Sequence, residues 1–256
     1  MKRKIYKQLL EWKNKRNGAT AVLIEGARRI GKSYIVEEFA RNEYDSYLLI
    51  DFNKADKVVW TWFDTLLEDL DTLLMNLQIH YGTRLTPGKS VVVFDEVQLC
   101  PRARAAIKYL VADGRFHYIE TGSLVSIKKN VRDIVIPSEE ESMPMFPMDF
   151  EEFLWAIGND LLMPYIRQCF EKRQPMGVHH RKAMEYFRTY MIVGGMPQAV
   201  QAFVDSKDFD KVDQVKRGIL RVYSNDISKY AAGLEHKVKS IFEQIPAQLQ
   251  KHEKKF

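Results

Sequence analysis

One short stretch constrains the fold of this chain more than any other feature of its sequence. Residues 26–33 read GARRIGKS and match the pattern G-x-x-x-x-G-K-[ST]. A short apolar run at 19–25 precedes the stretch, and residues 32–42 have a helical pattern. Glycines let the backbone turn so that successive N–H groups face one point, and the positive end of the following helix adds to their field. The sequence therefore predicts a strand, a phosphate-binding loop and a helix in direct succession.

We expect this loop to hold the phosphates of a nucleotide. Lys32 is expected to reach the β- and γ-phosphates, and the hydroxyl of Ser33 is expected to ligate Mg²⁺. The predicted nucleotide-binding residues are the whole loop, namely Gly26, Ala27, Arg28, Arg29, Ile30, Gly31, Lys32 and Ser33.

A second motif supports the first. The apolar run at 91–94 is followed directly by Asp95 and Glu96, which places two carboxylates at the carboxyl end of a buried strand, where α/β sheets bind ligands. Asp95 is expected to hold Mg²⁺, directly or through water, and Glu96 to orient and polarise the attacking water.

A third element follows the strand expected at 116–120. Thr121 and Ser123 lie at its end and are predicted to sense the γ-phosphate or to help place the water. An ordinary strand-to-loop turn is the open alternative. The predicted catalytic residues are Lys32, Glu96, Thr121 and Ser123.

Apolar runs alternate with helical patterns in the first part of the chain, which is typical of βαβ units and a parallel sheet covered on both faces. Beyond residue 147 we expect only helices, with a boundary between 147 and 160. The acidic stretch 138–142 is expected to be a solvated loop. Strands are expected at 19–25, 47–52, 90–94 and 116–120, and helices at 4–16, 32–42, 57–78, 101–112, 149–157, 160–173, 178–192 and 209–231.

Composition limits the classes of protein to which the chain can belong. Its 256 residues are 46% hydrophobic and 29% charged, which indicates a folded protein. The net charge of +5 permits an anionic partner without requiring one. Two cysteines, although one bridge between them is conceivable, favour free thiols in a reducing compartment. No apolar run approaches the roughly 18 residues of a membrane span, so we expect a cytoplasmic protein with no membrane partner.

Five motifs in this order, GARRIGKS, FDEVQLCP, ETGS, PMDFEEF and YMIVGGMPQAV, resemble the bacterial and archaeal AAA+ (AAA_14-type) ATP-binding proteins with a C-terminal DUF4143 domain. The resemblance implies ATP and Mg²⁺ as cofactors. It also implies an α/β fold of the P-loop NTPase class: a five-stranded parallel sheet in which one further strand separates the loop strand from the Asp95 strand, with 143–146 as the fifth strand. The implied domains are an ATPase domain at 1–150 with an N-terminal helix at 1–17, a helical lid at 151–234, and the start of a truncated winged-helix-like module at 235–256.

The chain departs from this family in one place. Many relatives carry a Gly-Arg pair shortly before the PMDFEEF segment, whereas this sequence is acidic there. The arginine finger is therefore unassigned, and the candidates are Arg28, Arg29, Arg102, Arg104, Arg115 and Arg132.

The function expected first is Mg²⁺-dependent ATP hydrolysis coupled to a macromolecular partner. The alternative is a nucleotide-gated module with little turnover that binds DNA or protein through its C-terminal part. A small-molecule kinase is a third class, disfavoured by the Asp95–Glu96 pair and the lid-like helices. The sequence does not predict the oligomeric state.

Overall fold

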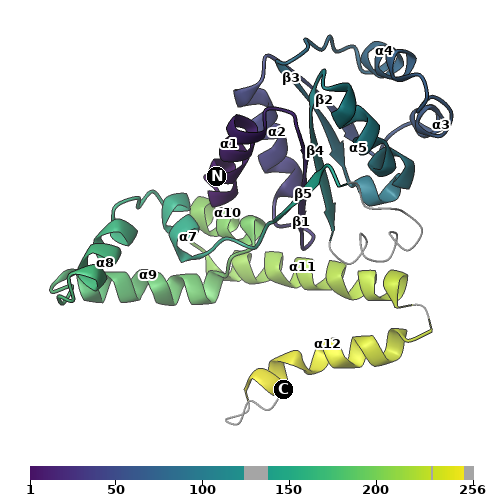
Figure 1. Ribbon diagram of the computed structural model, residues 1–256. Helices are drawn as coiled ribbons and strands as arrows, with labels where there is room; N and C mark the ends of the chain where they lie inside the picture. The colour runs from purple at the N-terminus through teal and green to yellow at the C-terminus, as the bar shows by residue number, and fades with distance from the viewer. Residues whose placement is uncertain (124–137, 232, 251–256) are drawn as a thin grey trace. The chain divides into compact units, whose positions relative to one another are not determined.

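The computed structural model describes residues 1–123, 138–231 and 233–250, and the chain divides into two units, Met1–Pro197 and Gln198–Phe256. The first unit contains a five-stranded sheet in the order β2-β3-β4-β1-β5 (Figure 1). Every strand pairing in it is parallel. The strands are β1 (Ala21–Gly26), β2 (Ser46–Asp51), β3 (Ser90–Asp95), β4 (His117–Ser123) and β5 (Glu140–Pro144).

This topology confirms the expected α/β fold with its five-stranded parallel sheet. It also confirms that one strand, β4, separates the strand before the loop from the strand that ends at Asp95. Because all five strands run the same way, their carboxyl ends lie at one edge of the sheet.

Helices cover both faces of the sheet, as Figure 1 shows. On one face, α1 (Lys4–Arg16) and α2 (Lys32–Glu43) pack on alternate strand residues such as Val22 and Ile24. The other face is covered by α3 (Lys57–Thr65), α4 (Leu70–Tyr81) and α5 (Pro101–Asp113). These helices pack on the strand residues in between, such as Leu23. All residues of β3 are buried, which explains why a strand covered on both faces has a continuous apolar sequence.

Three elements differ from their expected bounds. The helix expected at 57–78 is two helices, because Asp69 begins α4 and its Oδ1 accepts the Thr72 N–H at 3.0 Å. β4 continues through Ser123 because its last residues pair with the end of β1. The fifth strand is at Glu140–Pro144 instead of 143–146. It lies at the edge of the sheet, and its sequence EESMP lacks the apolar run that marks the other strands.

After β5 the first unit continues with the helices α7 (Phe150–Ala156), α8 (Leu162–Glu171) and α9 (His179–Val193). Gly194, with φ +79°, ends α9, and Pro197 begins α10 (Pro197–Ser206). The second unit holds the remainder of α10, then α11 (Phe209–Tyr230) and α12 (Glu235–Leu249). Among the described helices none is both long and apolar enough to cross a membrane. Cys100 and Cys169 are free and buried.

The acidic stretch 138–142 is only partly solvated, contrary to expectation. The guanidinium of Arg104 on α5 donates to both carboxylate oxygens of Glu140, at 2.9 and 2.7 Å. Both side chains of this ion pair are 4% exposed. A buried acid persists there because a bidentate arginine compensates its charge.

Glu120 on β4 lies in the same region and is fully buried. Neither oxygen of its carboxyl group has a hydrogen-bond partner among the described residues. Burial, and then the negative charge of Glu140, raise the pKa of Glu120 well above its ordinary value of 4.5. The folded chain therefore keeps Glu120 protonated at pH values where the unfolded chain ionises it.

This burial predicts a pH-dependent stability. Folding takes up a proton at Glu120 once the pH exceeds about 4.5, so the contribution of Glu120 to stability falls as the pH rises toward its folded pKa. Glu120→Gln removes this loss and is expected to raise the free energy of unfolding more at about pH 8 than at about pH 5, by about 1.4 kcal/mol for each unit of pKa shift that the interval spans. Urea unfolding at both pH values measures it, with exposed Glu68→Gln as the control; equal pH slopes in Glu120→Gln and wild type would contradict it.

Candidate functional site

The sheet brings the predicted motifs together at its carboxyl edge. β1 ends at Gly26, whose partner in register on β4 is Ser123. The hydroxyl of Ser33, at the start of α2, donates to Oδ1 of Asp95 at 2.8 Å. The phosphate-binding motif and the acid pair, 62 residues apart in the sequence, are therefore in direct contact.

The loop itself needs glycine at its first position for steric reasons. A Cβ built on Gly26 would lie 2.3 Å from the carbonyl oxygen of Met145 and 2.6 Å from Cδ1 of Ile30. Ile30 is fully buried, so it anchors the middle of the loop in the core. Gly31 has φ +91°, a left-handed conformation that glycine adopts without steric cost.

This close approach predicts the effect of a single methyl group. Gly26→Ala forces the backbone at Met145 or the buried Ile30 to shift, and we expect it to destabilise the protein by roughly 1–3 kcal/mol. Gly218→Ala is the matched control, because Gly218 lies within α11 and a Cβ there meets nothing within 4 Å; it should stabilise by roughly 0.5–1 kcal/mol. Thermal unfolding of both variants measures the difference, and a Gly26→Ala protein as stable as wild type would refute the steric argument.

Lys32 is buried, with 5% of its surface exposed. Its ammonium group donates to the carbonyl oxygens of Gly26 at 3.1 Å and Ala27 at 2.8 Å. Burial lowers the pKa of Lys32, and the nearby charges of Glu96 and Asp95 partly oppose that change. A desolvated cation held by neutral carbonyls at a loop of backbone amides is suited to receive an anion.

The acid pair is linked to Thr121 by hydrogen bonds. The Thr121 hydroxyl donates to Oδ1 of Asp95, and the Glu96 N–H donates to Thr121 Oγ1 at 3.2 Å. The side-chain amide of Gln98 donates to Oε2 of Glu96. Glu96 has φ +55°, which costs a non-glycine residue on the order of 1–2 kcal/mol. Thr121 lies inside β4, whose last residue is Ser123, and beside Asp95.

The remaining predicted residues occupy different surroundings. Arg28 and Arg29 lie in the loop, where Arg29 has φ +65°. Arg132 lies outside the described residues. The other finger candidates form ion pairs, Arg102 with Asp64, Arg104 with Glu140 and Arg115 with Asp113 and Asp71.

Sequence reasoning missed two residues at the site. Gln98 holds Glu96, and its position two residues after the acid was the only signal. Arg3 donates from Nη1 to the carbonyl oxygen of Ile30 in the loop at 2.7 Å. The basic N-terminus was visible in the sequence, but its tertiary contacts were not.

Comparisons with known families agree with this arrangement. Residues 18–154, more than half of the chain, match the AAA_14 model, described as an AAA domain. Residues 184–256 match a domain of unknown function (DUF8612). The DUF4143 assignment implied by the resemblance is therefore not confirmed.

Similarity to individual proteins is distant. No curated protein matches the chain. Among solved structures it is similar to PCH-2 of C. elegans, with 11% identity, 82% of this chain and 64% of that chain covered, and a TM-score of 0.41. It is also similar to a Signal Transduction ATPase with Numerous Domains protein with a tetratricopeptide repeat sensor from Pyrococcus horikoshii, with 13% identity, coverage of 84% and 32%, and a TM-score of 0.45. The chain thus spans less than two thirds of either protein, and its family follows from the AAA domain match: the chain belongs to the AAA domain family (AAA_14).

Proposed function

We propose that this chain binds ATP with Mg²⁺ and hydrolyses it, coupling the reaction to a macromolecular partner. The observation that carries the proposal is the 2.8 Å hydrogen bond between Ser33 and Asp95. It unites a phosphate-binding loop with a carboxylate at the edge where α/β sheets bind ligands. Membership of the AAA domain family supports the same activity.

The residues at this edge fit both a phosphate and a magnesium ion. The Lys32 ammonium is buried beside Asp95 and Glu96 and donates to two neutral carbonyls, so a phosphate oxygen would supply the negative partner it lacks in the loop. Ser33 and Asp95 present a hydroxyl and a carboxylate oxygen side by side, and Mg²⁺ prefers oxygen ligands of this kind. When bound, Mg²⁺ neutralises charge on the transferring phosphoryl group.

Glu96 is the proposed general base that orients the attacking water. Its backbone N–H is held by Thr121 and its carboxylate by Gln98, so the position of the base is fixed before substrate binds. Thr121 is proposed to couple this base to Asp95, and Ser123, beside Gly26 in register, to sense the γ-phosphate. A fixed base favours hydrolysis over a module that binds without turnover.

The domain plan belongs to the same proposal. Residues 1–150 would form the ATPase domain, 151–234 the lid, and 235–256 part of a winged-helix-like module that contacts DNA or protein. Helices α7 to α12 supply the helical character that this plan requires. The free, buried cysteines fit the reducing compartment expected for a cytoplasmic protein.

The test is phosphate release measured with ATP and with GTP, with Mg²⁺ or with a chelator, and with or without DNA. The proposal expects release that requires Mg²⁺ and favours ATP. Affinity for DNA that depends on ATP, without phosphate release, would support the nucleotide-gated module instead. A phosphorylated metabolite in place of free phosphate would indicate a kinase.

A further inference from the structure

Arg3 makes an unusual set of contacts for a residue that precedes the first helix. It is 8% exposed, and its guanidinium reaches three separate parts of the first unit. Nη1 donates to the carbonyl of Ile30 at 2.7 Å, Nη2 to the carbonyl of Phe146 at 2.6 Å, and Nε to Oε1 of Glu152 at 3.2 Å. Arg3 therefore joins the phosphate-binding loop, the segment after β5 and the start of α7.

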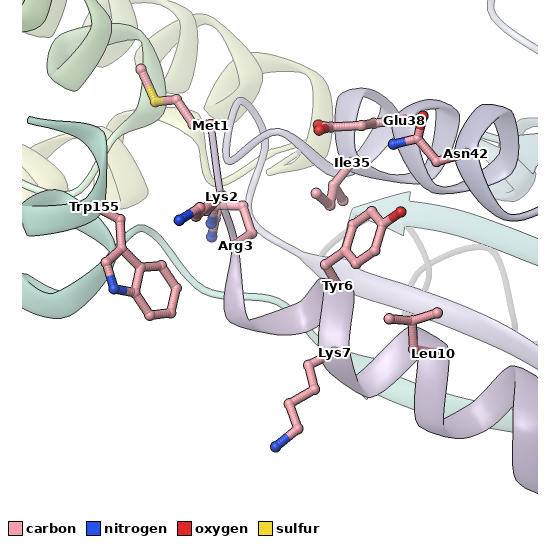
Figure 2. A pocket seen from close by; sticks show the side chains of 10 residues that line it. All are labelled: Met1, Lys2, Arg3, Tyr6, Lys7, Leu10, Ile35, Glu38, Asn42 and Trp155. Carbon is pink, nitrogen blue, oxygen red and sulfur yellow. The ribbon is translucent and has the colours of Figure 1, made fainter. Parts of the chain in front are cut away.

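Figure 2 shows the surroundings of Arg3. A cavity of about 330 Å³ is lined by side chains from the start of α1, from α2 and from α7. Ile35 comes from α2 and Trp155 from α7. The side chain of Arg3 lines this cavity and reaches from it to the loop.

The contact with Ile30 controls the direction of a neighbouring amide. A trans peptide is planar, so the C=O of Ile30 and the N–H of Gly31 point in opposite directions. Fixing the carbonyl toward Arg3 therefore fixes the Gly31 N–H away from Arg3. Gly31, with φ +91°, has no side chain to restrict this peptide, and a Cβ built on it would lie 3.8 Å from Arg3 Nη1.

We propose that Arg3 is a positioning residue of the nucleotide site, which holds the Ile30–Gly31 peptide so that the Gly31 N–H faces the bound phosphates. This inference rests on the proposed function, because it assigns the loop a phosphate ligand. Arg3 touches no reacting atom; it acts through Gly31.

The guanidinium is itself fixed by its other partners. Glu152 is buried, and its Oε1 also accepts the Lys4 N–H at 2.6 Å, while Oε2 accepts the N–H of Asp149 in the capping box of α7. The planar guanidinium of Arg3 donates from three nitrogens to three acceptors, which are the carbonyl oxygens of Ile30 and Phe146 and the carboxylate of Glu152. The single ammonium group of a lysine cannot reach all three acceptors at once.

Lys4 offers a matched control in the same segment. Its ammonium pairs with Asp149 and Glu151, the latter at 2.7 Å. Lys4 thus links α1 to the start of α7, as Arg3 does, but it does not contact the loop. Removing either side chain weakens the same helix contact, and only removing Arg3 releases the peptide.

The test compares Arg3→Met, Arg3→Lys and Lys4→Met by titration with a fluorescent ATP analogue. We expect Arg3→Met and Arg3→Lys each to weaken binding about tenfold, and Lys4→Met by less than about twofold, since a hydrogen bond from a charged donor is lost only in the first two. Full affinity in Arg3→Lys would show that a positive charge suffices and would overturn the positioning role. Equal losses in Arg3→Met and Lys4→Met would overturn it too.

A second measurement separates this inference from the proposed function. Hydrogen exchange of residues 27–33 in the nucleotide-free protein should be faster in Arg3→Met than in wild type or Lys4→Met. If wild type binds no nucleotide, the proposed function fails while the exchange still decides whether Arg3 fixes the loop. Arg3→Met leaves the buried carboxylate of Glu152 without its cation, which could unfold the variant. The double variant Arg3→Met/Glu152→Gln removes that buried charge and is measured beside it. Loop exchange as slow as in wild type in the double variant would refute the inference.

Discussion

Lys32→Ala is expected to abolish nucleotide binding, with an affinity loss of roughly a hundredfold or more. The lysine ammonium is buried at the loop, and its pKa is lowered by that burial. Its charge therefore acts on a bound phosphate with little solvent screening, and alanine offers no substitute. A fluorescent-nucleotide titration with wild type and variant measures the loss directly.

The stability of the free protein provides the internal check on this result. Alanine removes two hydrogen bonds to the carbonyl oxygens of Gly26 and Ala27, but it also removes the cost of burying an ammonium group. These two effects on the melting temperature without nucleotide oppose each other, so we expect that temperature to change less than the ATP-induced shift of wild type. ATP should raise the melting temperature of wild type by mass action and leave that of Lys32→Ala unmoved. The exposed Lys89→Ala variant, which loses only a surface pair with Asp45, controls for removal of a positive charge; wild-type affinity in Lys32→Ala would remove the loop from the nucleotide site.

Glu96→Gln is expected to retain nucleotide affinity and to lose phosphate release by roughly 10²–10⁴-fold. Glutamine has the same shape and preserves the contact with Gln98 through its carbonyl oxygen, but it cannot accept a proton from water. Ser33, Asp95 and Lys32 keep their contacts, so binding should not change. Steady-state phosphate release and the titration used for Lys32, run on the same preparation, separate the two effects.

The control for Glu96→Gln is Glu171→Gln, which neutralises an exposed carboxylate at the end of α8. Its phosphate release should equal that of wild type. Turnover in Glu96→Gln equal to wild type would exclude Glu96 as the base, while leaving nucleotide binding by the loop intact.

Local chemistry made part of this site predictable. Residues 26–33 carry the glycine spacing of a phosphate-binding loop, and 91–94 form an apolar run that ends in two acids. Each is a continuous segment whose conformation follows from neighbouring residues, so its motif survives in the sequence. Parallel strands then place both segments at one edge, and the family resemblance implies the single strand that separates them in the sheet.

Other parts had no local signal. The edge strand β5 has a polar sequence with no strand pattern of its own, and it is a strand because it pairs with β1. Asp69 begins a new helix inside what looked like one continuous helical stretch. Glu140 is buried because Arg104, from a distant helix, compensates its charge.

The sequence by itself determined the phosphate-binding loop, the acid pair and the alternation of strands and helices, because these depend on residues adjacent along the chain. Only the tertiary structure decided three contacts: Ser33 donates a hydrogen bond to Asp95, Thr121 makes hydrogen bonds with both Asp95 and Glu96, and Arg3 donates to the carbonyl oxygen of Ile30 in the loop. These contacts join residues that are far apart in the sequence: Thr121 and Asp95 are separated by 26 positions, Arg3 and Ile30 by 27, and Ser33 and Asp95 by 62. Their geometry is set by how helices pack on the sheet, which depends on the whole core and is not written in any single segment.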